Sequence, residues 1–131
     1  MELPEFALGL SARVESTVAE ADTAQSLGSG DVPVLGTPRV LALAEAATVA
    51  ATARLMPGGV TTVGTRAEIE HRAATPVGRL VTALATLTKV DGRKLTFEVS
   101  VRDGEDLVAE VRVERVILDR QRFIAKAQGD D

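Results

Sequence analysis

The sequence contains no cysteine, tyrosine or tryptophan, and only three phenylalanines among its 131 residues. Without cysteine there is no disulfide, no thiolate metal ligand and no cysteine nucleophile. So few aromatic side chains disfavour a base-stacking surface for single-stranded nucleic acid. The chain also has one histidine, so a zinc site would have to depend mostly on carboxylates, which is unusual. We therefore expect no metal, no cofactor and no nucleic-acid partner.

The net charge and the hydropathy of the chain limit its partners and its location. The formal net charge is -4, and an acidic chain gains nothing from a phosphate backbone. The most apolar window, residues 40–53, is too short to cross a bilayer, and the N-terminus lacks the basic start and long apolar run of a signal peptide. We expect a cytoplasmic protein without a membrane partner. Residues 1–131 should form one domain, with a core over about residues 6–119 and a polar tail, 120–131, that frays.

One long helix is predicted in the first half of the chain. Thr37 is a good N-cap and Pro38 suits the first helical position, so a helix should begin there and run to about Met56. Glu45 is the only charged residue between the arginines at 39 and 54. Alanine and leucine dominate on all sides of this helix, which predicts that it is buried on most faces.

Alternating apolar and polar residues predict five strands. The first covers residues 6–18, and four more cover residues 60–73, 79–90, 94–102 and 107–118. Asp91-Gly92 and Asp103-Gly104 are hairpin signals, so the sheet should be antiparallel. One long helix against such a sheet predicts an α+β domain with the hot-dog fold, an antiparallel sheet wrapped around one long central helix.

Glu45 and His71 stand where the pattern calls for apolar residues, and such exceptions tend to mark functional sites. A carboxylate in an apolar helix is costly unless it has a partner, although Glu45 could also lie on a narrow exposed edge. Strict alternation places His71 on the inner strand face with Val63, Thr65, Ala67 and Ile69, and it places Thr62 and Gly64 on the outer face. It suits proton transfer near neutral pH, but it could also be a satisfied core or interface histidine.

Arg115 and Thr37 are two further candidates. Arg115 shares the inward parity of its strand, so it either pairs with a carboxylate, Glu45 among them, or contacts a ligand. Helix capping would fully explain Thr37. Its hydroxyl would also lie beside free backbone N–H groups, which favour negative charge and could serve a thioester oxyanion. The common nucleophile, zinc and phosphate-loop motifs are absent from the sequence.

The stretch GTPRVLALAEAATVAATARLMPGG, followed by TTVGTRAEIEHRAATPVG, resembles the fluoroacetyl-CoA thioesterase-like branch of the hot-dog thioesterases. That branch has a helix that opens with threonine, a glutamate eight residues later and a strand that ends His-x-Ala-Ala-Thr-Pro-x-Gly. The resemblance covers about residues 35–127. It implies an acyl-CoA thioesterase that forms a homodimer, possibly a higher oligomer, with active sites at the subunit interface.

The resemblance also implies roles for five residues. Thr37, Glu45 and His71 correspond to the catalytic set, with Glu45 as nucleophile or base, His71 as the proton-transfer residue and Thr37 holding Glu45 or the acyl oxygen. Gly64 corresponds to a strand glycine that presents its backbone N–H near the acyl group, and Arg115 to an inward arginine.

This sequence departs from the branch before the helix, where fluoroacetyl-specific members carry lid phenylalanines and this chain has SGDVPVLG. Thioester hydrolysis is still implied, and the many alanines and valines favour a small or medium acyl group. Candidate cations for the CoA phosphates are Arg72, Arg79, Lys89, Arg93 and Lys94. The alternative is a non-catalytic acyl-CoA or small-ligand binding module on the same fold.

Overall fold

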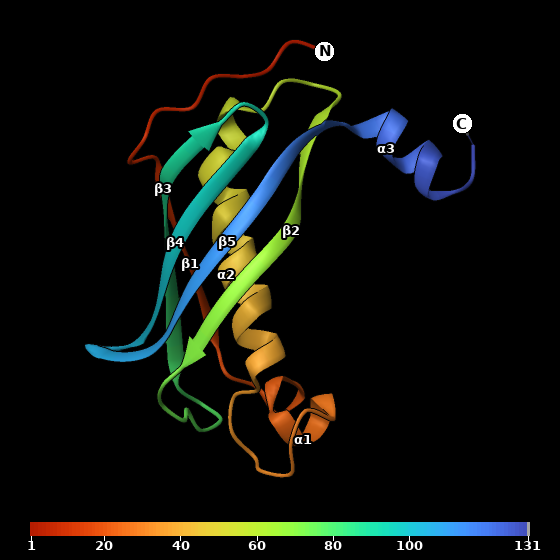
Figure 1. The fold of residues 1–131 in the computed structure, drawn as a ribbon. Helices are drawn as coiled ribbons and strands as arrows, with labels where there is room; N and C mark the ends of the chain where they lie inside the picture. The colour runs from red at the N-terminus through yellow and green to blue at the C-terminus, as the bar shows by residue number, and fades with distance from the viewer. Residues whose placement is uncertain (131) are drawn as a thin grey trace.

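The computed structural model describes residues 1–130. Its elements in chain order are β1 (Ser11–Thr17), α1 (Ala24–Leu27), α2 (Thr37–Thr52), β2 (Val60–His71), β3 (Leu80–Asp91), β4 (Lys94–Asp103), β5 (Asp106–Asp119) and α3 (Arg120–Ala127), with 3-10 turns at Glu20–Asp22 and Ala53–Leu55. The five strands form one antiparallel sheet in the order β1-β3-β4-β5-β2. The helix α2 lies against one face of this sheet (Figure 1). This arrangement confirms the predicted α+β hot-dog fold.

The core lies between α2 and the sheet. Alternate residues of β4 point toward the helix and are buried, and α2 presents small and branched side chains to them. The buried residues of β4 are Leu95, Phe97, Val99 and Val101, and those of α2 include Val40, Leu43, Ala44 and Ala47. Both predicted hairpins are present, because Asp91 pairs with Lys94 and Asp103 pairs with Asp106. The alternation and the hairpin signals therefore predicted the two hairpins of β3, β4 and β5 correctly.

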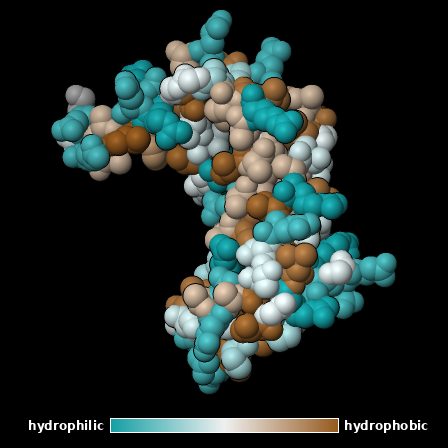
Figure 2. Space-filling model, turned by 180° about the vertical axis from the view of Figure 1, so that it is seen from behind, coloured by the Kyte–Doolittle hydropathy of each residue, from teal (hydrophilic) through white to brown (hydrophobic). Residues whose placement is uncertain are grey.

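The other side of α2 is uncovered, so the prediction of a helix buried on most faces is wrong for the single chain. Ala42, Ala46, Val49 and Ala50 are exposed, and Val49 retains 46% of its accessible surface. Figure 2 views the molecule from behind the sheet and shows pale and brown surface along its middle. A single sheet can cover only one side of a helix, and the remaining apolar stripe faces outward.

A β-bulge in β2 changes which residues face the helix. Gly64 pairs with Arg115 and Arg66 pairs with Glu114, so Thr65 has no partner in the register. After this extra residue, Ala67 pairs with Val113, and His71 with Ala109, both of which are buried. Strict alternation placed Val63 and Thr65 on the inner face, and that prediction is wrong. The bulge instead turns both Gly64 and His71 toward α2.

Both ends of the chain differ from the prediction. The first strand begins only at Ser11, because a turn at residues 8–9 places Gly9 at a φ of 89°. The tail that was expected to fray forms α3, capped by the Asp119 carboxylate, which accepts a hydrogen bond from the Arg122 N–H at 3.0 Å. Asp131 lies outside the described residues. In the described part of the chain, each helix is too short or too polar to span a bilayer.

Candidate active site

Thr37 and His71 meet at the start of α2. The N-cap is Gly36, whose carbonyl accepts hydrogen bonds from the N–H groups of Arg39 and Val40. Thr37 is the first helical residue and makes no capping bond, so its predicted N-cap role is wrong. Its hydroxyl oxygen lies 2.8 Å from His71 Nδ1 instead. The other ring nitrogen, Nε2, is buried and has no hydrogen-bond partner within residues 1–130.

Backbone hydrogen bonds hold this end of the helix in place. The Gly36 N–H donates to the Asp22 carbonyl at 2.9 Å, and the Leu35 N–H donates to the Thr75 carbonyl at 2.8 Å. Arg39 pairs with the Asp22 carboxylate at 3.0 Å. These bonds join the segment before α2 to the segment after β2. Thr37 and His71 are thus fixed side by side, although 34 positions separate them in the sequence.

Glu45 and Arg115 form a second polar cluster, which confirms that Arg115 points inward and pairs with a carboxylate. Arg115 Nη1 lies 3.2 Å from Glu45 Oε2. Arg115 also donates from Nε to the Thr62 hydroxyl at 2.9 Å and from Nη2 to the Thr62 carbonyl at 3.0 Å. Burial lowers the pKa of the Arg115 guanidinium from its usual value, because desolvation disfavours the charge, and the Glu45 carboxylate opposes this change. Thr62 thus orients the guanidinium that holds Glu45.

Sequence reasoning missed Thr62. The strict period of two placed it on the outer face, and the one local sign of the bulge is Gly64, because an isolated glycine inside a strand often marks a bulge.

Gly64 lies directly beneath the Glu45 carboxylate. A Cβ atom built at this position would fall on Glu45 Oε2 and would lie 3.3 Å from Arg115 Nη1. No other residue type leaves room for the carboxylate in this position. The backbone of Gly64 therefore forms one compact cluster with the side chains of Glu45 and Arg115.

Gly64→Ala should displace the carboxylate and weaken the ion pair with Arg115. We expect the free energy of unfolding to fall by about 1–3 kcal/mol, as for other overpacked sites. We expect kcat to fall by up to about 10²-fold, because a shift of ~1 Å in a reacting group can have that effect. Gly58→Ala is the matched control, since a Cβ there meets no atom within 4 Å. Equal activity and equal denaturation midpoints for the two variants would contradict this packing.

The two clusters do not meet within one chain. Thr37 and Glu45 are eight residues apart on α2, which corresponds to about 12 Å along the helix axis. Thr37 contacts His71, whereas Glu45 contacts Arg115 and lies over Gly64. The idea that Thr37 holds Glu45 within one chain is therefore not supported. The five residues form two half-sites, one at the helix start and one two turns further on.

A hollow of about 300 Å³ opens beside the first half-site. Thr37 and His71 line it together with small residues, among them Ala24, Val34 and Ala73. Most of the other lining residues are small or apolar, and Arg72 and Ser29 add polar groups to its walls.

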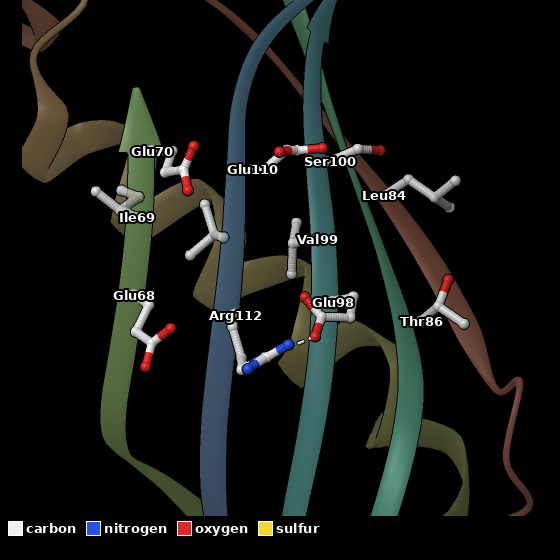
Figure 3. Close-up of a pocket in the computed structure, with 11 residues that line it drawn as sticks. Glu68, Ile69, Glu70, Leu84, Thr86, Glu98, Val99, Ser100, Glu110 and Arg112 are labelled. Carbon is white, nitrogen blue, oxygen red and sulfur yellow. Dashed lines mark hydrogen bonds and ion pairs between the residues drawn. The ribbon is translucent and has the colours of Figure 1, made fainter. Parts of the chain in front are cut away.

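A hollow of about 710 Å³ lies on the opposite face of the sheet. Figure 3 shows charged side chains on its rim, with Arg112 bound to Glu98 at 2.7 Å and Glu68, Glu70 and Glu110 nearby. These are solvated ion pairs, and no histidine takes part. Within residues 1–130, no three His, Asp or Glu side chains converge as a metal-binding group.

Comparison with known proteins identifies the family. The sequence model of the family described as fluoroacetyl-CoA-specific thioesterase, FlK, matches residues 18–121. The fluoroacetyl-CoA thioesterase of Streptantibioticus cattleyicolor is 37% identical over 95 residues, which cover 72% of this chain and 68% of that protein. The solved structure of the fluoroacetyl-CoA thioesterase FlK superimposes with a TM-score of 0.89 at 29% identity, covering 97% of this chain and 98% of its own.

A thioesterase superfamily member from Thermus thermophilus also superimposes with a TM-score of 0.89, at 24% identity and covering 96% of this chain and 93% of its own, which shows the shared fold. The family model covers most of the chain, and the curated relative exceeds 30% identity over more than two thirds of it. The predicted resemblance is thus confirmed by sequence and by structure. This chain belongs to the fluoroacetyl-CoA-specific thioesterase family and is a thioester hydrolase.

Proposed function

We propose that this protein hydrolyses the thioester of a small or medium acyl-CoA to the free acid and CoA. The observation that carries the proposal is the Glu45 carboxylate, which Arg115 holds over the backbone of Gly64 in a family of thioesterases. The 300 Å³ hollow beside Thr37 and His71 supports a short acyl group, because its volume is modest and most of its lining residues are small or apolar.

In the proposed reaction, Glu45 drives formation of the new C–O bond. Its carboxylate either attacks the thioester carbonyl carbon or takes a proton from the water that does so. The C–S bond then breaks, and the CoA thiolate takes a proton from the protonated His71 imidazole. On the first route, water then cleaves the anhydride formed on Glu45, releases the free acid and gives its proton to His71. On the second route, the proton that Glu45 took from water returns to His71. Thr37 orients the imidazole through the contact at Nδ1, which leaves Nε2 to handle the proton. The Gly64 N–H, in the role that the resemblance implies, stabilises the oxyanion.

The direct test is release of free thiol from a panel of acyl-CoA substrates, including fluoroacetyl-CoA, the compound named for the Streptantibioticus cattleyicolor relative. Turnover of short acyl-CoAs is the expected result. Ligand binding without turnover across the panel would instead select the non-catalytic binding module.

We further propose that the active protein is a homodimer in which each site combines the two half-sites. Two observations support this. The strand β2 is an edge of the sheet with 12 residues, and such a long edge favours pairing with a second copy. The apolar stripe of Ala42, Ala46, Val49 and Ala50 on α2 also lacks a cover.

We propose antiparallel pairing of β2 with its copy, with the two-fold axis at Glu68. This pairing would remove the free edge of β2 and cover the apolar stripe of α2. The bulged pair Gly64 and Thr65 then lies opposite His71 of the partner subunit. The side chains on the inner face of one strand lie opposite inner-face side chains of the other. On the outer face, the two copies of Glu68 meet at the axis. Arg66 offsets their repulsion, because it lies 3.1 Å from Glu68 and opposite Glu70 of the partner subunit. The Glu45 cluster of one subunit thus approaches the Thr37–His71 pair of the other.

Mixing two inactive variants tests the shared site. When Glu45→Gln and His71→Ala subunits are unfolded together and refolded in equal amounts, half of the dimers should be mixed. Each mixed dimer would contain one intact site, so about a quarter of the wild-type activity should return. Each variant refolded alone is the control. No recovery in a mixture shown to contain mixed dimers would rule out a site shared between subunits.

A further inference from the structure

We propose that α3 and the turn between β3 and β4 form a binding site for the phosphorylated adenosine end of CoA. This inference rests on the proposed acyl-CoA substrate and adds the part of the chain that holds the nucleotide. A hollow of about 550 Å³ lies at the end of the sheet where β5 passes into α3. Residues from the β3–β4 turn and from α3 line it together, among them Arg93, Arg122, Phe123 and Lys126.

The charges of this hollow suit a phosphorylated ligand. Arg93, Arg122 and Lys126 line it, and none of them takes part in an ion pair with another described residue. The one carboxylate in the lining, Asp119, is engaged as the N-cap of α3. Three unpaired cations in a chain with a net charge of -4 form a local positive surface, which phosphate oxygens complement.

Most of the other cations considered for this role are neutralised. Arg72 pairs with Glu70 and Glu110, Arg79 pairs with Asp103, and Lys94 pairs with Glu114. Of the five cations expected from the sequence, only Lys89 and Arg93 make no ion pair within residues 1–130, and only Arg93 lines this hollow. The positive surface at α3 was not anticipated, because the tail was expected to fray.

An aromatic side chain completes the site. Phe123 is one of three phenylalanines in the protein, and it remains 41% exposed on α3 where it lines the hollow. The other two, Phe6 and Phe97, are buried. An exposed aromatic ring beside several cations can stack on a nucleobase while the cations bind its phosphates. The combination of ring and charge therefore favours a nucleotide over inorganic phosphate.

The position of the hollow fits the shape of the substrate. Leu118 lines it and lies three residues from Arg115 along β5, a distance of about 10 Å. Figure 1 shows β5 running directly into α3, which stands out from the body beside the start of β2. In CoA the pantetheine arm separates the thioester from the phosphates, so a phosphate site has to lie away from the Glu45 cluster. Figure 2 shows the same arm overhanging a concave side of the molecule.

Charge removal on α3 tests this site. The double variant Arg122→Gln/Lys126→Gln removes two cations and keeps good helix formers. We expect the KM for acetyl-CoA to rise about 10- to 100-fold with little change in kcat, because hydrogen bonds to charged groups are among the strongest in binding. Acetyl-pantetheine, which lacks the nucleotide, should be hydrolysed equally by variant and wild type. Arg13→Gln/Arg102→Gln removes the same charge from two exposed residues of the sheet that lie outside this hollow and is the matched control.

A binding measurement separates this inference from the proposed activity. Calorimetric titration with adenosine 3′,5′-bisphosphate needs no turnover, and the wild type should bind it more tightly than the α3 double variant. If both bind equally, or if the control variant loses as much affinity, the site is not at α3 even though hydrolysis stands. If no acyl-CoA is hydrolysed but the wild type still binds the bisphosphate through α3, the site stands and the proposed activity fails.

Discussion

Replacing Glu45 with glutamine should lower kcat for acetyl-CoA hydrolysis by about 10²–10⁴-fold. The glutamine side chain keeps the size of glutamate and an oxygen that can accept the hydrogen bond from Arg115, which lies 3.2 Å away in the wild type. It cannot act as a nucleophile or take a proton from water. The loss should therefore appear in kcat, measured by thiol release under saturating substrate. Because Glu45 also compensates the buried charge of Arg115, the thermal midpoint should fall as well, so the assay is run well below the midpoint of the variant.

The control for this variant is Glu15→Gln, which removes a carboxylate from β1. Glu15 is exposed, and β1 is the edge of the sheet opposite to β2, which carries Gly64 and His71. Its activity should stay within a factor of about two of the wild type, as expected for a surface change. A Glu45→Gln enzyme with wild-type kcat would remove Glu45 from the mechanism.

His71→Ala should also lower kcat by about 10²–10⁴-fold, because it removes the group that we assign to proton transfer. His71 lies at the end of β2 and is only partly buried, so the protein should remain folded. Added imidazole should restore part of the activity by entering the space beside Thr37. The measurement is the rate of thiol release against imidazole concentration.

Rescue by imidazole distinguishes proton transfer from a purely structural role, since a loosened fold would not recover in this way. Thr37 provides a second comparison through the contact at His71 Nδ1. Thr37→Ser keeps the hydroxyl and should stay close to the wild type, whereas Thr37→Val should lose activity. If His71→Ala is slow but insensitive to imidazole, and Thr37→Val is fully active, the assigned roles are wrong.

Local patterns predicted most of the fold. The strand period of two, the Asp-Gly turns and one long apolar segment were sufficient for five strands, two hairpins and a helix on the sheet, because these signals lie within a few neighbouring residues. They also placed Arg115 and His71 on the inner face. The same reasoning put Val63 and Thr65 inside, because a bulge depends on how two distant strands pair. Gly64 is a local sign of it, but a glycine alone does not say that an extra residue is inserted.

By itself, the sequence determined the fold class and four residues worth testing, Thr37, Glu45, His71 and Arg115. The tertiary structure decided how they are grouped: Thr37 with His71, and Glu45 with Arg115 over Gly64. It also turned Thr62 toward Arg115 and gathered the cations of α3 near Arg93. The physical reason is that a periodic pattern reports which face a residue occupies. Contacts across the sheet depend on register, which no single segment specifies.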